Sequence, residues 1–238
     1  MQANTNTFVS LRYLFILAIF VLGANWFFTF QLVCLKDDNS FYYMPVRMYL
    51  SDALHAGTLP YWNPFLLNGV PQYADMQGAV WNPIAFILCY FFKYNHSLFL
   101  LEYVVYIFTG ALGIFKLLGL ITKNQFYLLA GVTVYICSGF VSGVANFINW
   151  TASLGFIPWV FYFYFITVQQ PNFRNSILLG IASWLMLVCG YPAFIIYTIY
   201  CVLALFIWHV WQQLKKGNHI WKELKFLLLA LFIGLALS

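Results

Sequence analysis

The chain has 238 residues, of which 63% are hydrophobic and only 7% are charged. Ordinary soluble domains carry roughly a quarter of their residues as charged side chains. Because so few charges cannot cover a water-soluble fold of this length, the composition excludes an ordinary soluble protein and indicates that a bilayer is its main solvent. The formal net charge of +5 is spread over span ends rather than gathered in one patch, so nucleic acid is not an expected partner.

Seven apolar stretches predict about seven transmembrane helices, since a span needs about 20 apolar residues. They are Leu11–Val33, Ser97–Ile121, Gln125–Ser142, Thr151–Val168, Ser176–Gly190, Ala193–Trp211 and Phe226–Ser238. Gly190 and Pro192 divide a run that is too long for one span. The last run reaches Ser238 without a polar stop. We therefore expect an all-α polytopic fold in which residues 1–238 form the N-terminal transmembrane part of a longer chain.

The distribution of Lys and Arg near span ends predicts the orientation. A cytoplasmic N-terminus places most of them inside, namely Arg12, Lys116, Lys123, Arg174, Lys215, Lys216, Lys222 and Lys225. The external side then holds only Lys36, Arg47 and Lys93. The basic run 215–225 either attracts anionic lipid headgroups or simply orients its two spans. The pattern predicts a multi-pass protein of the cell membrane whose first large loop, residues 34–96, is extracytoplasmic.

This first loop is long, and long ordered loops are usually functional. Within it, Pro45–Ala56 predicts an interfacial helix with proline in its first turn. An apolar stripe occupies one face of that helix, while Arg47, Ser51 and His55 occupy the other. The later segment Val80–Phe92 is too short to span and is expected to be re-entrant or interfacial.

A series of spaced residues in the loop resembles a known family. Asp37 and Asp38 come directly after the first span, and Trp62-Asn63-Pro64 follows farther along. The order is similar to the first external loop of the YfhO-type bacterial membrane proteins, which belong with the GT-C membrane glycosyltransferases. The matching residues are Asp38 with Pro45, then Gly57, Pro60, Trp62, Asn63 and Pro64, then Gly69 and Pro71, then Gln77 with Pro83. The match covers about residues 11–95; beyond them it rests on the number of helices.

The resemblance implies an enzyme that moves a sugar from a polyprenyl-phosphate carrier onto a cell-envelope glycopolymer acceptor, with inversion at C1. It also implies an essential acid just past the first span, which is Asp38 by position, with Asp37 as the neighbouring alternative. The chemistry agrees, because an acceptor hydroxyl needs a base as it attacks. Two adjacent carboxylates also leave a divalent cation possible, although neighbouring side chains on an extended chain point in opposite directions. No ligand spacing predicts a protein-bound metal, and no other cofactor is expected.

Other loop residues are weaker candidates, each with a simpler alternative. Arg47 suits a lipid phosphate, or is a solvated arginine. Glu102 lies about a turn inside the second span, where an acid suggests function, unless it only reaches the headgroups. Asp75 and Gln77 line a sugar pocket or are ordinary loop residues. The residues expected to shape the loop rather than to react are Trp62, Asn63, Pro64, Gly69 and Pro71.

Two other functions fit the same sequence. A non-catalytic envelope protein would use the loop to bind lipid-linked glycans or membrane lipid. A transporter would favour charged residues midway along several spans, whereas these span centres are nearly uncharged. The sequence therefore favours the transferase and keeps both alternatives open.

Overall fold

The computed structural model describes residues 11–30, 32, 37–75, 77–78 and 80–237. Residues 34–36, which begin the predicted external loop and include Cys34 and Lys36, lie outside the described residues, as does Ser238. Nearly all regular structure in the described part of the chain is helical. The helices are α1 (Leu11–Ala24), α2 (Trp26–Thr29), α3 (Met44–His55), α4 (Pro83–Phe91), α5 (His96–Leu118), α6 (Gln125–Ile136), α7 (Gly139–Gly143), α8 (Ile148–Gln169), α9 (Phe173–Cys189), α10 (Pro192–Lys215) and α11 (Trp221–Leu237), with short turns η1 (Asn39–Tyr43), η2 (Gln72–Ala74) and η3 (Val144–Asn146).

Among the residues that the structure describes, four helical segments are long and apolar enough to cross a bilayer. They are α5, the α6–α7 segment Gln125–Asn146, α8 and α10. The apolar helices α1, α9 and α11 are shorter. The chain is thus an all-helical membrane protein by length and composition of its helices, while the arrangement with seven spans stays a prediction.

Two of the expected spans are interrupted by polar residues. The run predicted as Leu11–Val33 breaks at Asn25, whose side-chain amide donates to the Val21 carbonyl at 2.9 Å and accepts from Tyr103 at 3.2 Å. A side chain that bonds to the backbone in this way competes with helix continuation. The second break follows Cys137, where the Ser138 hydroxyl caps α7.

The predicted division at Gly190–Pro192 is confirmed, since Pro192 begins α10.

Glycines allow α5 and α8 to pack at very short range. A Cβ atom at Gly155 of α8 would lie 2.9 Å from the Tyr106 carbonyl oxygen of α5. One at Gly113 of α5 would lie 2.8 Å from the Pro158 side chain of α8. Small residues at helix interfaces bring backbones together in membranes, where the hydrophobic effect between helices is absent. The contact between α5 and α8 is therefore the centre of the bundle.

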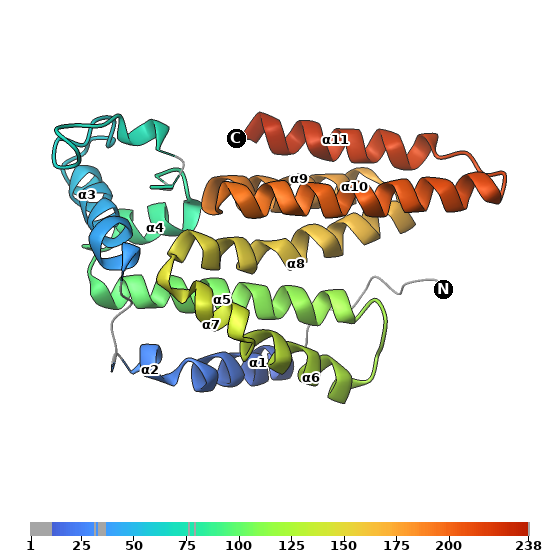
Figure 1. Ribbon diagram of the computed structural model, residues 1–238, viewed down its shortest axis with the longest axis horizontal. Coiled ribbons are helices and arrows are strands. Elements are labelled where there is room, and N and C mark those ends of the chain that lie inside the picture. Colours follow the sequence, from blue (N-terminus) through green and yellow to red (C-terminus); the bar gives the residue numbers. More distant parts are fainter. Residues whose placement is uncertain (1–10, 31, 33–36, 76, 79, 238) are drawn as a thin grey trace.

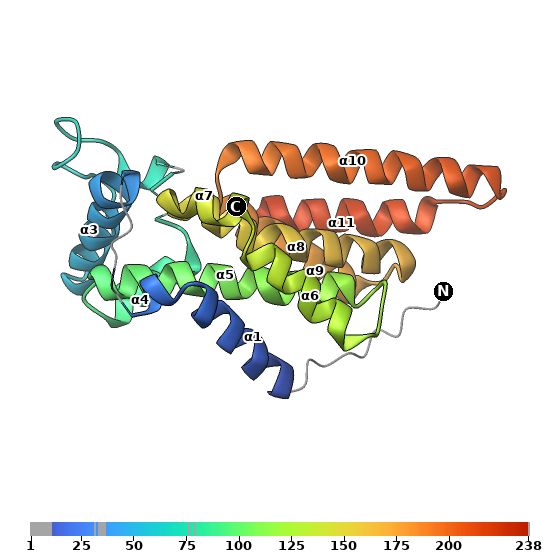
Figure 2. The ribbon, with the colours of Figure 1, turned by 60° about the horizontal axis from the view of Figure 1, so that its bottom comes forward.

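The bundle has two distinct ends. Helices α3 and α4, with the intervening loop, cover one end, and the turns α5–α6, α8–α9 and α10–α11 lie at the other (Figure 1). A view turned by 60° shows the same separation (Figure 2). The basic residues Lys123, Arg174 and Lys216 lie in or directly beside those three turns. They therefore share one end, as the sequence-based topology requires; which side of the membrane this end faces stays a prediction.

Replacing Gly155 by alanine is expected to destabilise the bundle by about 1–3 kcal/mol, because the added methyl group forces α5 and α8 apart. Gly143→Ala is the matched control, since a Cβ atom there meets no atom within 4 Å. Unfolding in detergent micelles measures both. A Gly155→Ala protein as stable as the Gly143→Ala protein would contradict the close packing.

Candidate functional site

Asp37 and Asp38 lie exposed at the end of the bundle that carries α3. Asp37 has a left-handed backbone with φ of 55°. Its carbonyl accepts from the amides of Ser40 and Phe41 at 2.9 and 3.1 Å. The pair therefore sits on a tight turn, not on the extended chain that the sequence suggested. The Asp38 carboxylate does not cap η1, because it makes no hydrogen bond to the backbone amides at the start of that turn.

Two buried polar residues, Tyr43 and Asn149, lie next to each other in the same region. The Tyr43 side chain is only 2% exposed. Burial, and next the charge of Asp38, raise the pKa of Tyr43 to about 12, although the Asn149 amide partly offsets the rise. Asn149 is fully buried in the first turn of α8, and its amide atoms meet the geometry of no hydrogen bond within the described residues. The charge of Asp38 thus acts on a buried phenol that lies beside the buried Asn149 amide.

Asn39 fixes the turn that carries the acids. Its side chain is fully buried and donates to the Ala145 carbonyl at 2.7 Å, while its oxygen accepts from the Ile148 amide at 3.0 Å. These bonds join η1 to the corner before α8, more than 100 residues away in sequence. The residue next to Asp38 is therefore anchored to the helical bundle.

Arg47 and Glu102 form a buried ion pair with exposed fractions of 1% and 0%. The Arg47 Nη2 atom lies 3.2 Å from Glu102 Oε1, and Nη1 donates to the Gly78 carbonyl at 2.6 Å. The hydroxyls of Tyr94 and Tyr106 also donate to the Glu102 carboxylate. Burial alone would lower the pKa of Arg47, but the carboxylate outweighs it and keeps the pKa above its ordinary value. Arg47 and Glu102, which the sequence makes candidates for binding a lipid phosphate or another substrate group, bind each other.

Two residues of the polar face of α3, Arg47 and Ser51, pack inward, unlike the solvent-facing arrangement expected of an interfacial helix, while His55 is exposed. Besides Arg47, Ser51 is buried there, within 3.3 Å of the Cys89 and Phe92 carbonyls. Its hydroxyl oxygen also accepts from the Tyr94 amide at 3.0 Å. These contacts place α4 against α3, which is why polar residues occupy the covered face.

The loop after α3 is held by its own contacts. Two backbone bonds pair Asn63 with Val70, and the Asn63 amide donates to Gln72 at 2.8 Å. Gln72 donates to Asp75 at 3.2 Å, and Tyr42 donates to the same carboxylate. Asp75 is thus bound within the protein.

Other expected loop residues have defined places. Gly69 has φ of 111°, and the Trp62 ring lies where its Cβ atom would be, 2.6 Å away. Pro64 lies in the turn after the Asn63 pairing, and Pro71 precedes η2. Gln77 is exposed, and its backbone amide donates to the Asp75 carboxylate.

A cavity of about 370 Å³ lies between η1, α3 and residues 63–66 of the loop. Its lining includes the rings of Phe41, Tyr49 and Phe65, the carboxylate of Asp52 and the amide of Asn63. Pockets for small ligands have volumes from about 300 Å³ upward and combine apolar walls with few polar groups. Sequence analysis did not single out Asp52, because a lone acid on a predicted helix carries no signal.

The site has few features of a metal centre. No cluster of three or more His, Cys, Asp or Glu side chains occurs among the residues the structure describes. The adjacent carboxylates of Asp37 and Asp38 are the remaining candidates for a divalent cation.

Comparisons of the chain with protein-family models, curated proteins and solved structures find no match.

Glu102→Gln is expected to destabilise the protein by about 3–5 kcal/mol, because it leaves the Arg47 charge buried without its partner. The double variant Arg47→Met with Glu102→Met should lose less stability than the sum of the losses of the single variants Arg47→Met and Glu102→Met. Denaturant unfolding in micelles measures this coupling, with Lys93→Met as an exposed control. Additive losses would contradict a coupled buried pair.

Proposed function

We propose that the protein is a membrane glycosyltransferase that moves a sugar from a polyprenyl-phosphate carrier to a cell-envelope acceptor outside the cytoplasm. The observation that carries the proposal is the exposed Asp37–Asp38 pair at the end of the first helical segment. The charge of Asp38 acts there on buried Tyr43, which lies beside the buried amide of Asn149. The resemblance of the first loop to the YfhO-type proteins supports the same reaction.

In the proposed reaction, the Asp38 carboxylate accepts the proton of an acceptor hydroxyl as its oxygen attacks C1 of the sugar. A new C1–O bond forms while the bond from C1 to the phosphate oxygen breaks. Polyprenyl phosphate leaves with the electron pair, and the configuration at C1 inverts. A tyrosine is already protonated at neutral pH, and the pKa of Tyr43 is raised further to about 12. Its hydroxyl is therefore available to donate a hydrogen bond to the substrate and does not compete as a base.

The cavity beside α3 supplies a place for the sugar or its acceptor. Aromatic faces of Phe41, Tyr49 and Phe65 suit the apolar face of a pyranose ring, and Asp52 suits its hydroxyls. Asp75 and Gln77 lie on the loop that closes this region. Arg47 and Glu102 act in this proposal as positioning residues, because their charges are paired with each other and hold α3 and the loop in place.

Asp38→Asn is expected to lower sugar transfer by about 100-fold or more, because the amide cannot accept the proton. The assay reconstitutes the protein in vesicles with a panel of labelled polyprenyl-phosphate sugars and measures released carrier. Glu223→Gln, an acid at the opposite end of the bundle, is the matched control and should transfer normally. Circular dichroism and gel filtration check that each variant folds.

Three results would contradict the proposal. Transfer that survives Asp37→Asn combined with Asp38→Asn would remove the assigned base. Binding of lipid-linked sugar without transfer by the wild-type protein would favour a non-catalytic glycan-binding protein. Flux of a labelled solute across the vesicle membrane would instead favour a transporter.

A further inference from the structure

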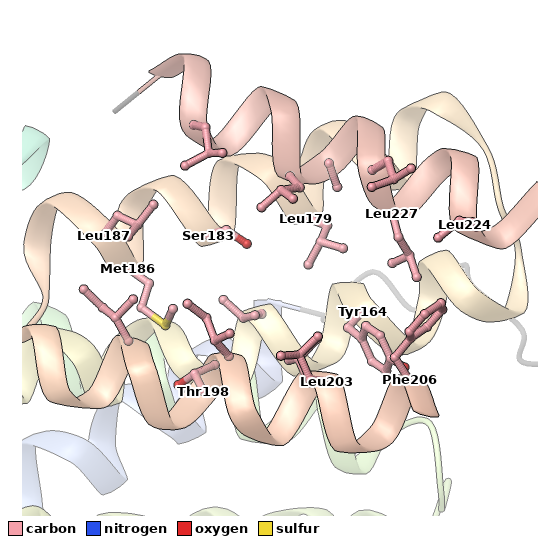
Figure 3. A pocket seen from close by; sticks show the side chains of 18 residues that line it. Tyr164, Leu179, Ser183, Met186, Leu187, Thr198, Leu203, Phe206, Leu224 and Leu227 are labelled. Carbon is pink, nitrogen blue, oxygen red and sulfur yellow. The ribbon is translucent and has the colours of Figure 1, made fainter. Parts of the chain in front are cut away.

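An apolar cavity of about 400 Å³ lies between α8, α9, α10 and α11 (Figure 3). Nearly all of its lining side chains are aliphatic or aromatic, and the few polar ones are Tyr164, Ser183 and Thr198. The Thr198 hydroxyl donates to the Phe194 carbonyl of its own helix at 2.7 Å. A cavity lined in this way does not hold water stably, because water needs two or more polar partners.

Loose packing of α10 produces the cavity. Most of the apolar side chains of α10 are exposed, including Tyr197, Leu203 and Ile207. Its contacts with α8 and α9 are sparse compared with those of α9 with α11. Both α8 and α10 are long and apolar enough to span a membrane. In a bilayer, the cavity between them is therefore adjacent to the hydrocarbon chains of the lipids. A hydrocarbon chain is therefore the occupant that matches both the lining and the location.

One end of the cavity is polar and basic. Tyr164 lies beside Phe206 at the end nearer the α10–α11 turn (Figure 3), and its buried hydroxyl has no hydrogen-bond partner within the described residues. Leu224 also lines this end, and Lys222 and Lys225 flank it on α11. On the other side of the turn are Lys215 and Lys216, while Glu223 is the acid of this segment. An apolar chain in the cavity would thus have its polar head beside a cationic turn.

We propose that the cavity binds one acyl chain of an anionic phospholipid, whose phosphate lies at Lys222 and Lys225. Basic residues beside spanning helices recognise anionic headgroups in this manner. The bound lipid fills the space that α10 leaves open and joins α10 to α9 and α11. This inference does not depend on the proposed transferase activity.

The test measures lipid binding to the delipidated protein in detergent by native mass spectrometry. Phosphatidylglycerol and phosphatidylcholine with identical acyl chains are the probes. The wild-type protein should form a one-to-one adduct with phosphatidylglycerol in preference to phosphatidylcholine. Lys222→Gln combined with Lys225→Gln should lower that preference by about fivefold or more. Lys93→Gln, at the opposite end of the bundle, should leave it unchanged.

Filling the cavity tests the position of the acyl chain. Val202→Phe places a ring in the cavity and should abolish the adduct, whereas Ile207→Phe, on the exposed face of the same helix, should retain it. Leu231→Phe fills the cavity from α11 and serves if Val202→Phe fails to fold.

Equal binding of the two lipids to the wild-type protein would overturn the proposal, as would an adduct that survives both cavity-filling variants. Stronger binding of polyprenyl phosphate than of phosphatidylglycerol would overturn the assignment to a phospholipid. A dimer of the chain that forms without bound lipid and is lost in the cavity-filling variants would also overturn the proposal.

Discussion

The buried ion pair between Arg47 and Glu102 is the interaction that holds α3 and the following loop on the end of the helical bundle. Two charges removed from water are costly, and they are tolerated only when their remaining hydrogen-bonding groups are satisfied. Here the Gly78 carbonyl and the Tyr94 and Tyr106 hydroxyls supply those partners. The network therefore joins α3 to the far end of the loop at Gly78, 31 residues from Arg47, and to α5 at Glu102, 55 residues from Arg47. Any sliding of α3 over the bundle would separate the two charges and leave each one buried without its partner.

The position of the acids follows from that constraint. The turn η1 runs directly into α3, so fixing α3 also fixes the chain that carries Asp38. Asn39 adds a second attachment to the corner before α8. A third comes from the bond between Tyr42 and Asp75, which ties η1 to the loop. The proposed base is thus held by three sets of contacts while its own carboxylate stays exposed.

Much of the helical framework could be predicted from the sequence, because apolar length and proline position are local signals. The long apolar runs of α5, α8 and α10 and the start of α10 at Pro192 are of this kind. The inward face of α3 could not be predicted, since Arg47 is polar by type and its partner lies 55 residues away. Asn149 was missed for the same reason, because only folding brings α8 beside η1. The apolar cavity depends on how loosely α10 packs, which no residue pattern states.

For the proposed function, the loop end and the basic end of the bundle must face opposite sides of the membrane, with the loop end outside. Cysteine labelling with a membrane-impermeant maleimide on intact cells tests this most directly. Asn68→Cys at the loop tip and Lys216→Cys at the α10–α11 turn would each be placed in a chain whose five native cysteines are replaced. We expect labelling at position 68 before permeabilisation and at position 216 only afterwards. Labelling of intact cells at position 216 but not at position 68 would contradict this orientation.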